Sequence, residues 1–218
     1  AYSEAMKWRL STPPPAEILG MNVDTCTPGR APKILFSALD AAAAKDIEPA
    51  FAAAGHIVVS NARSYRMFAD VPLVIPEVNP DHLALIARQR RERGWSGAIV
   101  TNPNCSTVVL SVVLAALRTF GLSRVMVTTL QAVSGAGYPG VASLDILGNV
   151  IPAISGEEEK MESETQKILG TLDRDGVTPH PMVVSATTTR VPVVDGHTES
   201  ISIEFEQRPT LEDVRIAL

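Results

Sequence analysis

Short apolar runs that alternate with helix-forming segments constrain what this chain can fold into. The runs are residues 33–39, 56–60, 71–75 and 97–101, and the helical patterns are residues 41–54, 79–93 and 106–120. Apolar runs of this kind indicate a parallel sheet that is covered by helices. Asp40 is placed to cap the first helix, and Asn79 with Pro80 is a favourable start for the second. Ligands of such sheets bind beyond the carboxyl ends of the strands, so the loops there are the first place to expect a site.

The sequence pattern changes after Gly121. Residues 124–133, 182–193 and 198–206 read as strands, and Ile201, Ile203 and Phe205 alternate with polar residues. Alternation of this kind indicates an antiparallel sheet with one wet face. We therefore expect a domain of residues 1–121 that ends with the third helix, followed by a domain of residues 122–218.

Cys105 lies at the turn between a strand and a helix. Pro103 breaks the apolar run that ends at Thr101, and the helical pattern starts immediately after the cysteine. Unpaired N–H groups and the helix dipole favour an anion at a helix start, so a thiolate forms more easily there. At this point Cys105 is either a nucleophile or a small buried residue. Cys26 has no helix after it and reads as a structural thiol.

Possible partners for a reactive cysteine lie in the second half of the chain. His197 follows a tight turn between two strands, where its side chain can be presented at a sheet edge. Arg190 precedes it at the end of a strand, and Gln131 is an amide in an apolar strand that needs a hydrogen bond or a pocket. We expect structural or surface roles for the other three histidines, which are His56, His82 and His180.

Two further segments suggest local structure. Ser155 and Glu158 fit a capping box that opens a polar helix over residues 157–169, in which Glu157 and Lys160 share a face and read as a solvated ion pair. Residues 135–140 match G-x-G-x-x-G, but Pro139 and the short stretch before Gly148 leave no room for the helix of a dinucleotide fingerprint. We expect a tight loop at this position.

Composition excludes several classes of function. Of the 218 residues, 45% are hydrophobic and 20% charged, which is typical of a folded globular chain. The net charge of −5 argues against nucleic acid or an anionic membrane as a main partner. The longest apolar run is about 15 residues, too short for a bilayer, and no signal peptide is visible at the start. Two distant cysteines favour a reducing cytoplasm over a disulfide framework.

Several motifs occur in an order that resembles one family. They are residues 60–66, 71–80, 104–107, 131–137, 156–169 and 190–199. Together they are similar to the aspartate-semialdehyde dehydrogenase family, specifically its archaeal and fungal type. The resemblance implies an α/β fold with an incomplete Rossmann-like parallel-sheet nucleotide domain, followed by part of an α+β catalytic and dimerisation domain with a largely antiparallel sheet.

The resemblance also implies a role for each matched residue. Cys105 would be the nucleophile that forms a thiohemiacetal and then a thioester, and His197 would be the acid/base that takes the thiol proton. Gln131 would orient the acyl group. The substrate would be held by Arg190 at its carboxylate, Glu157 at its amino group and Lys160 at phosphate, with Asn104 beside them. The residues lining the NADP site would be Ser37, Asn61, Ser134 and Gly135, and no metal is expected.

The implied reaction is the reversible NADPH-dependent reduction of L-4-aspartyl phosphate to L-aspartate 4-semialdehyde, in the biosynthesis of lysine, threonine and methionine. Its partners would be the small substrate and inorganic phosphate, in a cytoplasmic homodimer or homotetramer. The family opens with a Gly-rich phosphate loop and continues beyond Leu218, so we expect an internal fragment whose cofactor site is incomplete. Such a fragment is expected to bind NADP poorly and to be inactive by itself, whereas the full-length protein would be active. The alternatives are a related reductase of a CoA thioester, such as malonyl-CoA reductase, and a non-enzymatic domain with an inert Cys105.

Overall fold

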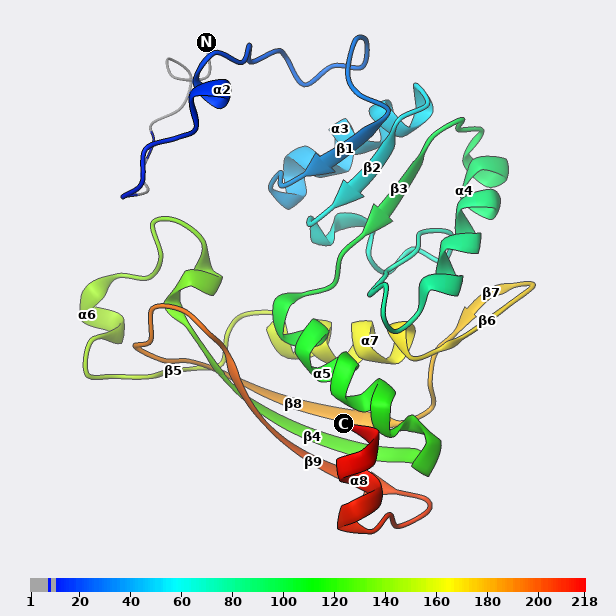
Figure 1. The fold of residues 1–218 in the computed structure, drawn as a ribbon, viewed down its shortest axis with the longest axis vertical. Coiled ribbons are helices and arrows are strands. Elements are labelled where there is room, and N and C mark those ends of the chain that lie inside the picture. The colour runs from blue at the N-terminus through cyan, green and yellow to red at the C-terminus, as the bar shows by residue number, and fades with distance from the viewer. Residues whose placement is uncertain (1–7, 9–10) are drawn as a thin grey trace.

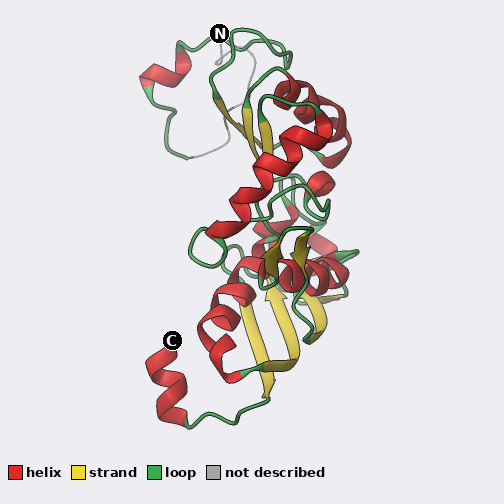
Figure 2. Ribbon diagram, turned by 90° about the vertical axis from the view of Figure 1, so that its right-hand side faces the viewer, coloured by secondary structure: helices red, strands yellow, loops and turns green. Residues whose placement is uncertain are grey.

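The structure is a computed structural model that describes Trp8 and residues 11–218. The expectation that residues 1–7 carry no signal peptide lies outside the described residues. Two sheets occupy opposite ends of the molecule, and helices lie between them (Figures 1 and 2). The described part of the N-terminal segment extends away from the first sheet and contains the short helix α2, Ala16–Leu19.

The first sheet is parallel, as the apolar runs predict. Its strands lie in the order β1 (Ile34–Ser37), β2 (Ile57–Ser60) and β3 (Ala98–Thr101). Ser37 is level with Ser60, and Ser60 with Thr101, so the three carboxyl ends meet at one edge. The helices that pack against this sheet are α3 (Ala41–Ala53) and α4 (Leu85–Arg93). The predicted cap is confirmed, because the Asp40 carboxylate accepts hydrogen bonds from the amides of Ala42 and Ala43.

The second sheet is mixed, with the order β5 (Ile151–Pro152), β8 (Val183–Arg190), β4 (Leu122–Gln131) and β9 (Thr198–Phe205). Two of its pairings are antiparallel, as predicted, whereas the central strands β4 and β8 run parallel. Burial alternates along β4 and β8, so one face is exposed. The other face packs against α5 (Cys105–Leu117) and α7 (Glu157–Ile168), with Leu110, Leu114 and Met161 in its core.

The remaining elements are short. They are the 3-10 turns η1 (Arg63–Tyr65), η2 (Pro80–Ala84), η3 (Arg118–Phe120) and η4 (Val133–Ala136), the helices α6 (Ser143–Ile146) and α8 (Leu211–Ala217), and the hairpin of β6 (Thr171–Asp173) and β7 (Gly176–Thr178). The four residues of α6 confirm that no long helix follows the glycine motif at 135–140. Residues 135 and 136 end the 3-10 turn η4, and residues 137–140 form a loop.

The prediction of a strand at residues 71–75 is wrong. The segment is buried but forms only a single parallel bridge, between Leu73 and Thr101. Pro72 has no N–H to donate, and Pro76 ends the extended run, so a regular ladder cannot continue. The Pro72 carbonyl still accepts hydrogen bonds from the amide and hydroxyl of Thr101.

Two predicted helix caps are also wrong. Asn79 does not cap the following helix; its side chain bonds instead to the Ile75 amide and the Leu73 carbonyl, and the chain starts with 3-10 turns before α4. The capping box at Ser155 does not form either. Gly156 occupies the cap position of α7 at φ 68°, a left-handed conformation that glycine adopts readily, and no side chain caps the helix there.

Buried charges on α7 connect the two sheets. The Glu164 carboxylate accepts hydrogen bonds from Arg66 Nη1 at 2.9 Å and from the Asn104 amide at 2.7 Å. One turn later, Lys167 Nζ donates to the carbonyls of Arg66, Phe68 and Val71 at 2.7–2.9 Å. Burial lowers the pKa of Lys167 to about 8, while the charges of Asp70 and Glu164 oppose this shift. The loop after β2 is therefore fixed to the helix that covers the second sheet.

We predict that Lys167→Met lowers the free energy of unfolding by at least about 2 kcal/mol, because three buried carbonyls lose their donor. The matched control is Lys45→Met, since Lys45 is exposed on α3; it should change stability by less than about 0.5 kcal/mol. Urea unfolding followed by circular dichroism measures both. Equal stability of the two variants would contradict a structural role for the buried ammonium.

Candidate active site

The turn that carries Cys105 is held by hydrogen bonds on both sides. Cys105 is the first residue of α5, and its thiol is exposed. The Asn104 side chain caps the helix by accepting from the amides of Ser106 and Thr107. Its Nδ2 group donates to Glu157 Oε2 at 2.6 Å, and its backbone amide donates to Glu164. These contacts leave the thiol at the positive end of the helix with little freedom of the backbone.

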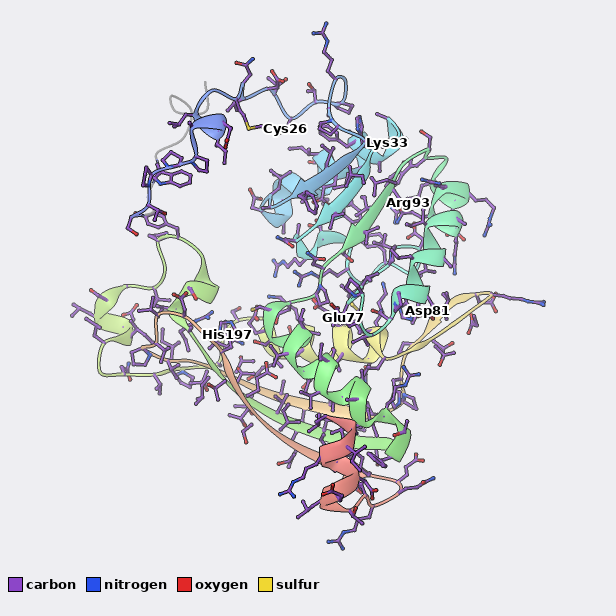
Figure 3. The ribbon with its side chains drawn as sticks, in the orientation of Figure 1. Cys26, Lys33, Glu77, Asp81, Arg93 and His197 are labelled. Atoms are coloured by element: carbon purple, nitrogen blue, oxygen red, sulfur yellow. The ribbon has the colours of Figure 1, made fainter. Side chains whose placement is uncertain are left out.

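His197 meets this thiol from the second sheet. Its Nε2 atom lies 3.3 Å from Cys105 Sγ, and its Nδ1 atom accepts a hydrogen bond from the Ala132 amide at 3.1 Å. Figure 3 shows His197 at the end of the second sheet that faces the first turn of α5, whereas Cys26 lies in the N-terminal segment. Burial, followed by the positive charge of Arg190, lowers the pKa of His197, and Glu157 partly opposes this effect. The net effect favours the neutral imidazole over the imidazolium.

Arg190 and Gln131 lie next to each other where the parallel strands β8 and β4 end. They are level in the sheet, and both side chains are buried. Arg190 Nη1 donates to the Ala132 carbonyl at 2.8 Å and approaches Gln131 Oε1 at 3.5 Å. A guanidinium so placed has further N–H groups for a carboxylate ligand.

Gly135 allows this cluster to pack. A methyl group at Gly135 would lie 2.7 Å from Arg190 Nη1 and 3.1 Å from His197 Nε2. The loop that contains Gly135 is fixed to the turn before His197, because the amides of Val133 and Ser134 donate to the carbonyls of Val193 and Val194. Only a residue without a side chain fits there without moving the two charged or polar groups.

Glu157 and Lys160 form the ion pair that their spacing suggests. The distance between Lys160 Nζ and Glu157 Oε1 is 2.6 Å, with side chains 22% and 13% exposed, respectively. The pair is thus more shielded than the solvated helix face that we expected from the sequence. Glu157 also accepts a hydrogen bond from Asn104, the residue that precedes Cys105, so the ion pair lies beside the thiol turn.

The four residues expected at the cofactor site are not gathered in one cavity. A cavity of about 450 Å³ contains both Asn61 and Cys105 in its wall, and Asn61 Oδ1 accepts a hydrogen bond from Asn102 Nδ2. Ser37 lines a separate cavity of about 190 Å³ beside β1. Ser134 lies with Gly137 at a third hollow, near the turn before His197. Gly135 packs against Arg190 and His197.

Sequence reasoning did not assign Glu164, Arg66 or the Ala132 amide to the site. Glu164 lies seven residues after Glu157, so the two carboxylates share one face of α7, and that spacing was the available signal. Glu199 is a further titratable group, two residues after His197. Neither of its carboxylate oxygens has a hydrogen-bond partner among the described residues, and burial raises its pKa to about 7.

Within residues 11–218 and Trp8, no cluster of three or more His, Cys, Asp or Glu side chains is arranged to hold a metal ion. The helices of the same described part of the chain include none that is both long and apolar enough to span a membrane.

Two family models match the chain. Residues 6–86 match the NAD binding domain of semialdehyde dehydrogenase, and residues 114–218 match its dimerisation domain. Between these two matches lies the turn that carries Cys105.

Relatives and solved structures are similar over most of the chain. Aspartate-semialdehyde dehydrogenase from Methanothermobacter thermautotrophicus is 50% identical over 100% of this chain and 63% of its own length. The Archaeoglobus fulgidus enzyme is 53% identical over 84% of the chain and 54% of its own length. The structure of the Candida albicans enzyme with NADP has a TM-score of 0.88 and 42% identity, covering 99% of this chain and 64% of that one.

This chain therefore spans roughly three fifths of the length of such relatives. Archaeal and fungal enzymes align with most of the chain, including its two larger sheets. The NAD binding domain model matches the first part of the chain and the dimerisation domain model matches the second. The chain belongs to the aspartate-semialdehyde dehydrogenase family.

Proposed function

We propose that the protein catalyses the reversible NADPH-dependent reduction of L-4-aspartyl phosphate to L-aspartate 4-semialdehyde through a thioester on Cys105. The observation that carries the proposal is the contact between Cys105 Sγ and His197 Nε2, 3.3 Å apart, at a helix start beside a buried arginine. A thiol, an imidazole and a guanidinium so arranged suit attack on the carbonyl of a carboxylate-bearing substrate. Splitting the reaction through a covalent intermediate lowers each barrier.

The substrate-binding roles follow the charges around the thiol. Arg190 binds the substrate carboxylate, and Gln131, next to it, orients the acyl group. Glu157 receives the substrate amino group, and Lys160 contributes to phosphate binding. In this assignment Asn104 positions Glu157 and caps the helix of the nucleophile.

The cofactor that we propose is NADP, with which the structure of the Candida albicans enzyme was determined. The Ser37 hydroxyl is buried without a hydrogen-bond partner among the described residues, at the carboxyl end of β1, where a dinucleotide of such a sheet binds. Ser37, Asn61, Ser134 and Gly135 would hold it. When bound, NADP supplies the hydride acceptor for oxidation of the aldehyde.

We propose a homo-oligomer, because residues 114–218 match a dimerisation domain and one face of the second sheet is open. Met126, Leu130 and Val183 are 64%, 43% and 59% exposed on that sheet. Residues 1–121 would form the nucleotide part and residues 122–218 the catalytic and dimerisation part. Both cysteines are free, which suits a reducing cytoplasm and the biosynthesis of amino acids there.

We predict that Cys105→Ala, made in the full-length protein, lowers kcat by at least about 10⁴-fold, because the thioester is formed on the sulfur of this residue. Production of NADPH from aspartate semialdehyde, phosphate and NADP measures the loss. Circular dichroism and the unfolding midpoint show whether the variant is folded. Retained activity in a folded variant would overturn the proposed mechanism.

Replacement of Glu157 tests the substrate class. Glu157→Gln keeps an oxygen that can accept from Asn104 but removes the charge opposite the substrate ammonium. We expect KM for aspartate semialdehyde to rise about 10- to 100-fold, the usual effect of losing a charge-assisted hydrogen bond. With a substrate analogue that lacks the amino group, KM of Glu157→Gln should equal that of the wild type. Glu159→Gln, exposed in the same helical turn, is the matched control. Equal effects on both substrates would favour an acid without an amino group, as in a CoA-thioester reductase.

Gly135 offers a test of packing at the site. Gly135→Ala should lower kcat/KM about 100-fold, because the new methyl group must displace Arg190 or His197 by a few tenths of an ångström or more. Gly29→Ala is the control, since a methyl group there meets nothing within 4 Å. Steady-state kinetics of both variants are compared with wild type. Unchanged kinetics in Gly135→Ala would show that the close packing has no functional consequence.

A further inference from the structure

The Glu157 carboxylate has a hydrogen-bond partner on each of its oxygens. Oε1 accepts from Lys160 Nζ at 2.6 Å, and Oε2 accepts from Asn104 Nδ2 at 2.6 Å. The side chains of Glu157 and Lys160 are both largely shielded from solvent. The carboxylate to which the proposed function assigns the substrate ammonium therefore already binds an ammonium group, and that group belongs to the protein itself.

The two partners of Glu157 differ in how freely they can leave it. Asn104 is held at both ends, because its side-chain oxygen caps α5 and its backbone amide donates to Glu164. Lys160 instead carries its ammonium group on a flexible four-carbon chain. Within residues 11–218, Glu157 Oε1 is the one acceptor within hydrogen-bond distance of that ammonium group. Asn104 thus keeps the carboxylate in place, while Lys160 is the partner that can be exchanged.

The surroundings of Glu157 do not suit two ammonium groups at once. Glu157 supplies a single negative charge, and its other partner, Asn104, is neutral. The neighbouring Glu158 accepts a hydrogen bond from the Thr188 amide, and Glu159 is exposed. Like charges repel more strongly in a shielded position than in water, and a second cation would remain uncompensated. A substrate ammonium that binds Glu157 is therefore expected to take the place of Lys160.

We propose that Glu157 and Lys160 form an exchangeable ion pair, in which the substrate ammonium replaces Lys160 on Glu157 and the released Lys160 binds phosphate. This inference rests on the proposed function, which assigns the substrate ammonium to Glu157 and phosphate to Lys160. It adds that the two ligands strengthen each other's binding, because the first ligand releases the cation that the second one needs.

The charges explain the direction of this coupling. Before the exchange, the Glu157 carboxylate cancels the charge of Lys160 and repels an anion nearby. After the exchange, the substrate ammonium neutralises Glu157, and the charge of Lys160 is free to pair with phosphate. Linkage then requires that phosphate strengthens the binding of the substrate by the same factor. We expect a factor of about tenfold, within the usual range for coupled sites.

Isothermal titration calorimetry on the full-length protein measures this coupling without turnover. L-2-aminobutyrate has the carboxylate and the ammonium of aspartate semialdehyde but no aldehyde, and butyrate lacks the ammonium as well. We expect inorganic phosphate to bind about tenfold more tightly in the presence of saturating L-2-aminobutyrate, and with unchanged Kd in the presence of butyrate. An equal phosphate Kd with and without L-2-aminobutyrate would overturn the proposal.

Lys160→Met separates the exchange from a general effect of bound ligand. Phosphate should bind this variant more weakly than wild type, with a Kd that L-2-aminobutyrate no longer changes. L-2-aminobutyrate itself should bind about threefold more tightly, because Glu157 has no internal cation to lose. A purely structural role of Lys160 would not produce that gain. Lys45→Met, exposed on α3, is the matched control and should keep the wild-type coupling. Coupling that survives in Lys160→Met, shown to be folded by circular dichroism, would contradict the exchange.

Failure of the exchange and failure of the proposed function give different results. An active dehydrogenase that binds L-2-aminobutyrate and phosphate independently of each other would refute the exchange alone. A full-length protein that lacks dehydrogenase activity and binds neither probe would refute the proposed function and the exchange with it.

Discussion

The arrangement of the site depends on the hydrogen bonds that the buried Glu164 carboxylate accepts. Each of its oxygens has one partner from a different part of the fold: Arg66 from the loop after β2, and the amide of Asn104 from the turn after β3. A buried carboxylate is costly unless it is paired, and here both oxygens are satisfied. The ion pair thereby determines where α7 lies relative to the parallel sheet. Since α7 also covers the second sheet, both halves of the site are placed by this group.

The Ala132 backbone and Gly135 set the positions of the side chains around the Cys105 thiol. The Ala132 backbone contacts His197 through its N–H and Arg190 through its carbonyl. Gly135 leaves room for both side chains to approach the loop. Ala132 takes part through its backbone and Gly135 through the lack of a side chain, so composition contains no sign of either contribution. They act by restricting orientation, which in a site of this type decides whether an imidazole accepts or donates a proton.

Predictions of helix ends from the sequence are correct where the contact that decides them joins residues close together in the chain. Asp40 caps its helix through amides two and three residues away, and Gly94 and Gly121 end theirs with positive φ. Such predictions are wrong where a residue from another segment takes the hydrogen bond in place of the local one. The Asn79 side chain bonds to a buried loop and not to its own helix, and the segment around Leu73 is buried without a ladder. The parallel pairing of β4 with β8 also escapes the sequence, because alternating burial marks a half-exposed strand and not the direction of its neighbour.

By itself, the sequence determined the elements and the kinds of group that a site would contain: a cysteine at a helix start, a histidine after a tight turn, and a parallel sheet followed by strands with alternating burial. These follow from periodicity and from interactions within a few residues. Only the tertiary structure decided which nitrogen of His197 faces Cys105, because that contact joins residues 92 apart. The link of Glu164 to Arg66 and Asn104 likewise spans 98 and 60 residues. Such contacts form when packing brings distant segments together, and no local pattern records which donor meets which acceptor.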